Sequence, residues 1–285
     1  MKVGFIGTGV MGSSLVKHLL TAGHDVIIYT RTAKKAESLV QAGAKLVESP
    51  KEVARAAETI FTMVGYPSDV EEVYFGDNGI LENAQQGAVL VDLTTSKPNL
   101  AKRIFEEAAS KGLKALDAPV SGGDIGAQKG TLSIMVGGAE PHFQEVLPLL
   151  ELMGENIVYQ GPAGSGQHTK MCNQINIATN MIGVCESLVY AKKAGLDPEQ
   201  VLRSISSGAA GSWSLSNLAP RMIAEDFAPG FYIKHFIKDM KIAAEEAELM
   251  GLDLPGLRLS LGMYEKLAEQ GYSENGTQAL IKHFE

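Results

Sequence analysis

Hydrophobic positions follow two different patterns, one in each half of the chain. From residue 1 to about 160, short apolar runs rich in β-branched residues alternate with segments in which apolar residues recur every three or four positions. The first pattern predicts buried strands and the second predicts helices. The predicted strands are Lys2–Ile6, Asp25–Tyr29, Thr59–Val64, Ala88–Leu93, Leu113–Ala118, Leu132–Val136 and Ile157–Gln160, and the predicted helices between them are Gly12–Ala22, Ala33–Ala42, Pro50–Ala56, Ser68–Val73, Asn99–Lys111 and Glu140–Leu152. This alternation predicts a doubly wound α/β domain with a mainly parallel sheet, because parallel strands require crossover connections.

After Gly166 the strand pattern is absent and only helical periodicity remains. The predicted helices are Gly166–Lys193, Pro198–Ile205, Leu215–Ala224, Ile233–Met250 and Leu257–Glu269. We therefore expect an α/β domain over residues 1–161 and an all-helical domain over residues 162–285. The first of these helices is apolar on more than one face, so it must be buried inside its domain or against another subunit. This favours a homodimer or homotetramer.

Composition narrows the possible functions. The 285 residues include 25 basic and 33 acidic side chains, a net charge of −8 without a basic cluster. This balance disfavours nucleic acid and acidic membranes as partners. Two cysteines, Cys172 and Cys185, lack metal-ligand spacing and are expected to be buried small hydrophobes in a reducing compartment. The first strand begins too early for a leader sequence, so a cytoplasmic location is expected, and the scattered histidines predict no metal site.

The strongest motif lies directly after the first predicted strand. It reads Gly7-Thr8-Gly9-Val10-Met11-Gly12 and opens the first predicted helix. Gly7 permits a tight turn, Gly9 lets the backbone approach a pyrophosphate, and Gly12 lets helix and strand pack closely. The helix N-terminus adds N–H donors and a positive dipole. Residues 1–161 are therefore predicted to bind a dinucleotide, whereas a structural turn alone is the alternative.

The end of the second predicted strand decides which nicotinamide cofactor is expected. An acidic residue there typically binds the adenosine ribose hydroxyls of NAD. This chain has Arg31 and Thr32 instead. Arg31 can form a bidentate pair with a 2′-phosphate, and Thr32 can donate to the phosphate oxygens. NADP(H) is therefore favoured over NAD(H), with a solvated surface arginine as the alternative.

Three further segments carry candidate chemistry. In Asp117–Gly123, the Ser121 hydroxyl and the N–H groups of Gly122 and Gly123 can hold a carboxylate, although a plain glycine-rich turn is the alternative. Lys170 falls near the start of the long helix, where the dipole and partial burial disfavour the ammonium form, so it can act as a general acid or base. An ordinary surface lysine is the alternative.

Two more pairs of polar residues accompany these segments. Asn173 and Gln174 share the helix face of Lys170 and can bind the substrate or orient the lysine. Lys238 and Asp239 interrupt an apolar helix start, which is costly unless they face a cleft or each other. Asp239 is therefore a further candidate for substrate binding, and a solvated ion pair is the alternative.

Taken together, these segments resemble the β-hydroxyacid dehydrogenase family, which includes 3-hydroxyisobutyrate dehydrogenases and the tartronate, glyoxylate and succinic semialdehyde reductases. The similarity runs in order over nearly the whole chain, at Gly4–Gly12, Asp117–Gly123, Gly130–Gly138, Gly164–Asn173 and Lys238–Met240. The resemblance implies a Rossmann-type domain joined by a long helix to a helical domain, with the active site in the cleft.

The resemblance also implies residue roles. It makes Lys170 the essential acid/base and assigns the substrate carboxylate to Ser121, Gly122 and Gly123. It places Thr95 and Lys238 near the nicotinamide and matches Arg31 and Thr32 to the NADP(H)-preferring members. It further assigns a cofactor-lining loop that contains Val64, Tyr66 and Pro67. The chain departs from the family at Thr8, where leucine is common, and at Gln174, where many members have asparagine, so either Asn173 or Gln174 can supply the substrate amide.

These features predict an oxidoreductase that acts on CH–OH groups. It is expected to transfer hydride between NADP(H) and a small carboxylate-bearing 3-hydroxy acid, semialdehyde or glyoxylate-like substrate. One alternative is an imine reductase of the same fold, but its relatives replace the lysine that this chain keeps as Lys170. A 6-phosphogluconate-type enzyme needs a larger helical domain. The remaining alternative is an NADP-binding sensor or scaffold without turnover, which would not need Lys170.

Overall fold

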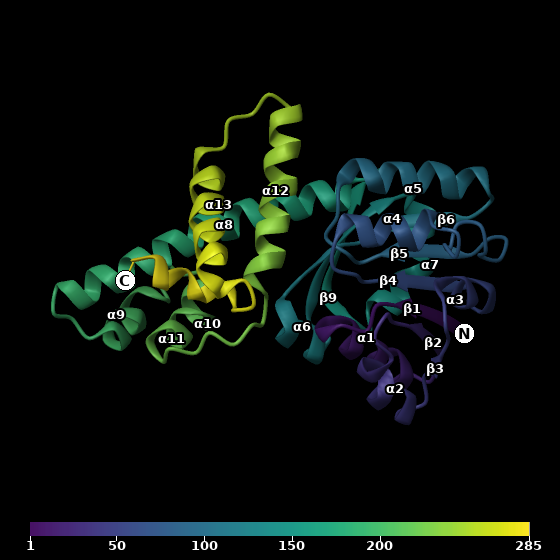
Figure 1. Cartoon of the computed structure of the whole chain (residues 1–285), viewed down its shortest axis with the longest axis horizontal. Helices are drawn as coiled ribbons and strands as arrows, with labels where there is room; N and C mark the ends of the chain where they lie inside the picture. Colours follow the sequence, from purple (N-terminus) through teal and green to yellow (C-terminus); the bar gives the residue numbers. More distant parts are fainter. Residues whose placement is uncertain (285) are drawn as a thin grey trace. The chain divides into compact units, whose positions relative to one another are not determined.

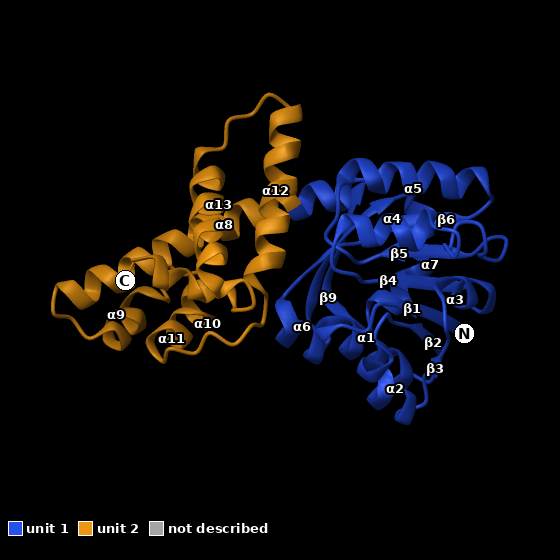
Figure 2. Cartoon of the chain, in the orientation of Figure 1, with its two compact units in different colours: residues 1–170 blue, residues 171–285 orange. Residues whose placement is uncertain are grey.

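The computed structural model describes residues 1–284 and divides the chain into two compact units, residues 1–170 and 171–285 (Figures 1 and 2). The division falls inside a single long helix, α8 (Ser165–Lys193), whose first turns belong to unit 1 and whose remainder belongs to unit 2. Each unit has its own apolar core. The α/β character of the first unit and the all-helical character of the second confirm the predicted fold class.

Unit 1 is organised around one sheet of nine strands. Their spatial order is β3-β2-β1-β4-β5-β6-β8-β7, with β9 paired to β8. The strands from β3 to β6 are parallel, β8 runs antiparallel to β6 and β7, and β9 is parallel to β8. The strands are β1 (Lys2–Ile6), β2 (Asp25–Tyr29), β3 (Lys45–Leu46), β4 (Thr59–Thr62), β5 (Val89–Asp92), β6 (Lys114–Asp117), β7 (Val120–Ser121), β8 (Leu132–Gly138) and β9 (Gly154–Gly161).

Helices cover both faces of this sheet, which explains why every residue of its central strands β4 and β5 is buried. Neighbouring residues alternate between two buried clusters: Phe5 and Phe61 belong to one, whereas Ile6 and Ile60 belong to the other. This is the period of two that a pleated strand imposes on its side chains. The helical elements are α1 (Val10–Thr21), η1 (Ala33–Ala36), α2 (Glu37–Gln41), α3 (Pro50–Ala56), α4 (Pro67–Phe75), α5 (Pro98–Ser110), α6 (Gly123–Lys129) and α7 (Glu140–Leu150).

Three elements of unit 1 escape the sequence patterns. Strands β3 and β7 have only two residues each, which is too short for a periodic signal. Helix α6 lies in a glycine-rich stretch and ends at Gly130, whose φ of 69° is the left-handed conformation that glycine favours. The segment after Asp117, for which a plain glycine-rich turn was the alternative to a carboxylate site, contains the short strand β7 and the start of α6.

Unit 2 consists of helices around one apolar cluster. Residues of α8 such as Met181 and Leu188 are buried there, whereas Tyr190 of the same helix is exposed. The expectation that both cysteines are buried is wrong for Cys172, which is exposed on α8, because only Cys185 falls on a buried face of the helix. The other helical elements are α9 (Pro198–Ile205), α10 (Trp213–Asn217), α11 (Ala219–Ile223), α12 (Ile233–Leu249), α13 (Pro255–Leu267), η2 (Ala268–Tyr272) and η3 (Thr277–Phe284).

One predicted helix of unit 2 is divided in two. Residues 215–224 were expected to form a single helix, but α10 ends at Asn217 and α11 starts at Ala219. Pro220 lies in the first turn of α11, where its missing N–H costs nothing. Inside a continuous helix the same proline would remove a hydrogen bond and collide with the preceding turn.

Candidate active site

The topology of the sheet singles out one edge of unit 1. From β1 the chain proceeds to β2 and β3 on one side, then returns to add β4, β5 and β6 on the other. In open α/β sheets, ligands bind at the carboxyl ends of the strands where the order reverses in this way. The predicted cofactor residues of unit 1 follow the carboxyl ends of four such strands: Gly7–Gly12 follow β1, Arg31 and Thr32 follow β2, Val64, Tyr66 and Pro67 follow β4, and Thr95 follows β5. The fold thus gathers them at one edge. Lys238 lies on α12 of unit 2.

The glycine turn after β1 is shaped so that side chains are excluded where the backbone is crowded. Gly7 has a φ of 100°, and a Cβ there would collide with the carbonyl oxygen of Met63. A Cβ on Gly12 would likewise collide with the carbonyl oxygen of Gly7. Gly9, by contrast, is exposed, and no atom lies within 4 Å of an added Cβ. The open space at Gly9, before the N-terminus of α1, fits the close approach of a cofactor pyrophosphate.

Arg31 is held by an acidic residue from another element. Its Nη1 lies 2.9 Å from Oδ1 of Asp69, in the first turn of α4, and the arginine side chain is 67% exposed. The second carboxylate oxygen of Asp69 accepts a hydrogen bond of 3.0 Å from the backbone N–H of Tyr66. The Asp69 carboxylate therefore orients Arg31, the residue predicted to bind the 2′-phosphate. It also caps α4, the helix that follows the predicted cofactor loop. Thr32 is exposed beside Arg31.

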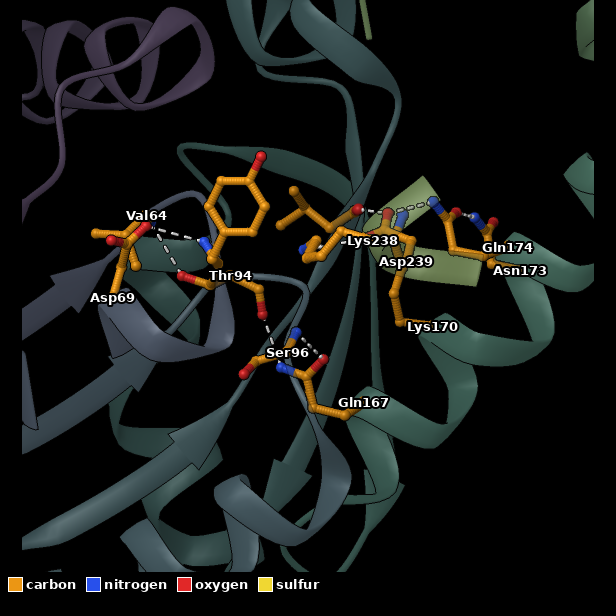
Figure 3. Close-up of polar contacts among 12 residues, drawn as sticks. Val64, Asp69, Thr94, Ser96, Gln167, Lys170, Asn173, Gln174, Lys238 and Asp239 are labelled. Atoms are coloured by element: carbon orange, nitrogen blue, oxygen red, sulfur yellow. Dashed lines mark hydrogen bonds and ion pairs between the residues drawn. The ribbon is translucent and has the colours of Figure 1, made fainter. Parts of the chain in front are cut away.

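The loop after β5 is fixed by side chains. The Oδ1 of Asp92 accepts a hydrogen bond of 3.0 Å from the Thr94 N–H. The Thr94 hydroxyl in turn accepts one of 3.0 Å from the N–H of Val64 (Figure 3). Thr94 and Ser96 are buried, and Thr95 between them is half-buried. The predicted nicotinamide residue Thr95 thus lies in a loop tied to the loop after β4.

The first turn of α8 is anchored to the sheet through Asp117 at the end of β6. Its two carboxylate oxygens accept hydrogen bonds from the backbone N–H groups of Gly164 (2.8 Å) and Gln167 (2.9 Å). Burial raises the pKa of the Asp117 carboxyl to about 6, and these N–H donors oppose the rise by stabilising the carboxylate. A carboxylate at a helix N-terminus is also favoured by the helix dipole.

Lys170 lies one helical turn after Gln167. It is 6% exposed, and its Nζ donates a hydrogen bond of 2.8 Å to the carbonyl oxygen of Val120. Val120 and Ser121 form β7, and Gly122 and Gly123 follow with positive φ values of 133° and 63°. The Nζ of Lys170 is therefore directed to β7, which contains Ser121 and directly precedes the other two predicted carboxylate-binding residues. The alternative of an ordinary surface lysine does not fit this burial.

In unit 2 the polar candidates form a connected chain. Nδ2 of Asn173 donates to Oε1 of Gln174 at 2.7 Å, and Nε2 of Gln174 donates to Oδ2 of Asp239 at 2.6 Å. The other carboxylate oxygen of Asp239 lies 2.8 Å from Nζ of Lys238. The Lys238 side chain is 12% exposed and that of Asp239 is 2% exposed. The pair is therefore largely buried, and the alternative of a solvated ion pair is wrong. Gln174 is also buried, whereas Asn173 is half-buried.

Sequence reasoning assigned no role to Gln167, Asp69 or Asp117. Gln167 has no exposed surface, and both ends of its amide are bonded to the loop after β5. No local pattern reveals these contacts, because the partners are 71 and 73 residues away. A local pattern does mark Asp69, because a proline at the first helical position followed by an acidic residue at the third is typical of a helix start.

Within residues 1–284, no group of three or more His, Cys, Asp or Glu side chains is arranged to hold a metal ion. Over the same residues, no helix is both long and apolar enough to cross a membrane.

Comparison with known proteins defines the class. Residues 2–161 match the family model for the NAD binding domain of 6-phosphogluconate dehydrogenase, and residues 164–284 match the model described as NAD-binding of NADP-dependent 3-hydroxyisobutyrate dehydrogenase. With the sheet topology and the glycine turn, these matches define a nicotinamide-dependent oxidoreductase with a Rossmann-type domain. The chain belongs to the β-hydroxyacid dehydrogenase family, and it is an NAD(P)-dependent dehydrogenase that acts on the CH–OH group of hydroxyacids.

Individual relatives cover nearly the whole chain. An uncharacterized oxidoreductase of Bacillus subtilis is 65% identical over 98% of this chain and 97% of its own length. The 2-hydroxy-3-oxopropionate reductase of Escherichia coli is 41% identical over 100% and 97%, respectively. Among solved structures, a Mycobacterium tuberculosis 3-hydroxyisobutyrate dehydrogenase with L-serine has a TM-score of 0.90 at 29% identity, covering 99% of this chain and 98% of that one.

Proposed function

We propose that the protein reduces a small carboxylate-bearing semialdehyde or 2-oxo acid with NADPH and catalyses the reverse oxidation of the corresponding hydroxy acid. The observation that carries the proposal is the buried Lys170 ammonium, which donates to Val120 O at the start of the Ser121–Gly123 segment. A buried lysine near a predicted anion site is suited to bind the substrate and to transfer a proton to it. The Escherichia coli relative supports this substrate class through its name, since 2-hydroxy-3-oxopropionate is a carboxylate-bearing aldehyde.

In the proposed reaction, NADPH held by the glycine turn and by the loops after β2, β4 and β5 would supply a hydride to the carbonyl carbon of the substrate. The carbonyl π bond breaks, and its electron pair moves to the oxygen, which becomes an alkoxide. Lys170 transfers a proton from Nζ to this oxygen and is left as a neutral amine, which takes a proton from solvent. Neutralising the developing alkoxide in a buried site lowers the barrier because the charge is poorly solvated there.

Substrate orientation falls to the Ser121 hydroxyl and the N–H groups of Gly122 and Gly123, which we propose hold the substrate carboxylate. The positive φ values of both glycines turn successive N–H groups in a way that suits an anion. We further propose that Asn173 presents its amide to the substrate. Gln174 and Asp239 complete the hydrogen-bonded chain behind it.

The proposed preference for NADPH rests on Arg31 and Thr32. The Arg31 guanidinium is exposed and is oriented by Asp69. A guanidinium can bind a 2′-phosphate with two parallel hydrogen bonds. We place Thr8, Val10 and Met11 along the pyrophosphate turn with the three glycines, and Val64, Tyr66, Pro67, Thr95 and Lys238 along the rest of the cofactor.

The test is a fluorescence titration of the purified full chain with NADPH and with NADH, followed by turnover of a panel of carbonyl compounds. The panel contains glyoxylate and the semialdehydes of succinate, tartronate and methylmalonate. Butyraldehyde is the matched control, because it has the carbon number of succinic semialdehyde but no carboxylate. We expect tighter binding of NADPH, and a kcat/KM for the preferred acid about 10- to 100-fold above its uncharged control, which is the effect of one or two charge-assisted hydrogen bonds. Cofactor binding without turnover of any panel member, or equal rates with butyraldehyde, would contradict the proposal.

A further inference from the structure

The side chain of Gln167 makes a pair of buried hydrogen bonds that the proposed chemistry does not use directly. Its Oε1 accepts from the Ser96 N–H at 2.9 Å, and its Nε2 donates to the Thr94 carbonyl oxygen at 2.7 Å (Figure 3). Gln167 has no exposed surface. A buried amide needs partners for both its oxygen and its nitrogen, and here the same short loop supplies them. The side chain is therefore fixed in direction as well as in place.

This loop connects to the predicted cofactor site on its other side. Thr94, whose carbonyl accepts from Gln167, also accepts from the Val64 N–H through its hydroxyl at 3.0 Å. Thr95, the predicted nicotinamide neighbour, is the residue between the two partners of Gln167. The loops after β4 and β5 are thus hydrogen-bonded to each other, and Gln167 connects them to α8.

The backbone of Gln167 is held independently from the neighbouring strand. Its N–H donates to Oδ2 of Asp117 at 2.9 Å, while Oδ1 of the same carboxylate accepts from Gly164 at 2.8 Å. Gly166 cannot be replaced without cost, since a Cβ there would lie 2.6 Å from the Asp117 carbonyl oxygen. The first turn of α8 is consequently fixed to β6 by its backbone and to the β5 loop by the Gln167 amide.

Lys170 follows Gln167 by three positions, so the two side chains lie on the same face of the helix. The Nζ of Lys170 then reaches Val120 O at 2.8 Å. A small rotation or shift of the first turn of α8 would move this Nζ relative to the Thr94–Ser96 loop. The distance between the proton donor and the nicotinamide end of the cofactor depends on that relation.

We infer that Gln167 is a positioning residue for hydride transfer, which sets Lys170 at a fixed distance from the Thr94–Ser96 loop. The inference rests on the proposed function, in which Lys170 is the acid/base and this loop borders the nicotinamide. Gln167 touches neither reactant in this scheme and acts through its neighbours. Its removal should slow the chemical step while cofactor binding, which depends on the glycine turn and Arg31, is preserved.

Two substitutions separate positioning from folding. Gln167→Met keeps the length of the side chain and removes both hydrogen bonds. We expect kcat to fall by about 100-fold, the scale on which a misplacement near 1 Å slows catalysis. With NADPH deuterated at the transferred position, the isotope effect on kcat should increase because the chemical step becomes more nearly rate-limiting. The Kd for NADPH should match that of the wild type.

Gln167→Glu provides a conditional rescue. A protonated carboxyl can still accept from Ser96 and donate to Thr94, whereas a carboxylate can only accept and would repel the Thr94 carbonyl oxygen. The ratio of variant to wild-type kcat should therefore increase as the pH falls. The matched control is Gln85→Met, because Gln85 is an exposed amide that donates to Arg55 O at 2.7 Å, away from α8. Its kcat, isotope effect and NADPH Kd should be those of the wild type.

The outcomes distinguish the inference from the function on which it rests. A wild-type protein that reduces no carbonyl compound would overturn both. If the wild type is active and Gln167→Met retains its kcat and isotope effect, only the inference is wrong. If both Gln167 variants lose NADPH binding together with activity, Gln167 has a folding role and the inference is again wrong. A selective loss of kcat with pH-dependent recovery in Gln167→Glu would establish it.

Discussion

The glycine turn after β1 and the polar network around Gln167 serve the same edge of the sheet but are built in different ways. The turn consists of backbone and empty space: Gly7 and Gly12 fill positions where a Cβ would meet a carbonyl oxygen, and Gly9 leaves room for a ligand. The network consists of side chains from distant segments, with the Gln167 amide and the Asp117 carboxylate holding backbone groups of other elements. In the proposed function, the turn lets the cofactor approach the backbone, whereas the network holds Lys170 in place. Damage to the first should therefore affect cofactor affinity, and damage to the second should affect turnover.

The largest effect is expected at Lys170, the proposed proton donor, which the network holds in position. Lys170→Met removes the proposed proton donor and should lower kcat by about 1,000-fold, within the range typical of general acid/base catalysis. NADPH binding should persist, because the substitution leaves the glycine turn and Arg31, which are proposed to bind the cofactor, unchanged. Lys192→Met is the control, since Lys192 is exposed in the last turn of the same helix. Comparable rates for Lys170→Met and the wild type would remove Lys170 from the mechanism.

The next largest effect is expected at Gly9, in the glycine turn after β1. Gly9→Ala adds a methyl group to open space, so the fold should be unchanged, but the methyl should obstruct the pyrophosphate. Loss of one hydrogen bond to a charged group corresponds to roughly 10- to 100-fold weaker NADPH binding. Gly262→Ala, in the middle of α13 with no atom near the added Cβ, should bind NADPH normally and gain about 0.5–1 kcal/mol of stability. Thermal melts and cofactor titrations of both variants check the comparison.

A third substitution tests cofactor discrimination at the end of β2. Arg31→Gln removes the charge proposed to bind the 2′-phosphate, so the NADPH-to-NADH affinity ratio should fall by about 10-fold or more. Affinity for NADH should hardly change. Arg103→Gln is the control, because Arg103 of α5 forms an exposed ion pair of the same 2.9 Å length with Glu71 of α4 and has no proposed cofactor contact. An unchanged ratio in Arg31→Gln would mean that the arginine is only a surface residue.

The smallest effect concerns stability, and it contrasts a group of the network with one in unit 2. Burial raises the pKa of Asp117 to about 6, so its contribution to stability is present below its ordinary value of 3.8 and is lost as pH rises through about 6. Burial, with smaller effects from Lys238 and Lys234, lowers the pKa of His235 below its ordinary 6.5. The stability that depends on neutral His235 is therefore present above pH 6.5 and is lost as the pH falls.

Asp117→Asn and His235→Gln should thus change the pH dependence of Tm in opposite directions. The Tm of Asp117→Asn relative to that of the wild type should increase as the pH rises toward neutrality. The Tm of His235→Gln relative to that of the wild type should increase as the pH falls below 6.5. Shifts of about 2–4 °C in Tm correspond to roughly 1 kcal/mol in a protein of this size. Parallel pH profiles for the wild type and both variants would show that neither group titrates differently in the folded state.

Elements that depend on interactions between residues close in the sequence were predicted correctly, and features that depend on distant residues were not. Strand β1 was predicted with its observed ends, and so were α3 and α9, because apolar periodicity and a proline near each helix start are local signals. Prediction failed where an element was too short, as in β7, or where burial depended on helix rotation, as at Cys172. Buried Lys238 and Asp239 were recognised as unusual, but only the structure shows that they contact each other and that Gln174 bonds to Asp239.

By itself, the sequence determined the alternating α/β half, the helical half and the glycine turn, because each follows from the conformational preferences of neighbouring residues. It also marked Lys170 and Arg31 as the charged groups proposed to act on the substrate and on the cofactor. The tertiary structure decided which groups meet: Asp69 with Arg31, Val120 with Lys170, and Gln167 with a loop 71 residues away. A buried amide or carboxylate is stable only when distant backbone groups satisfy it, and those partners are brought into reach only when the sheet has formed.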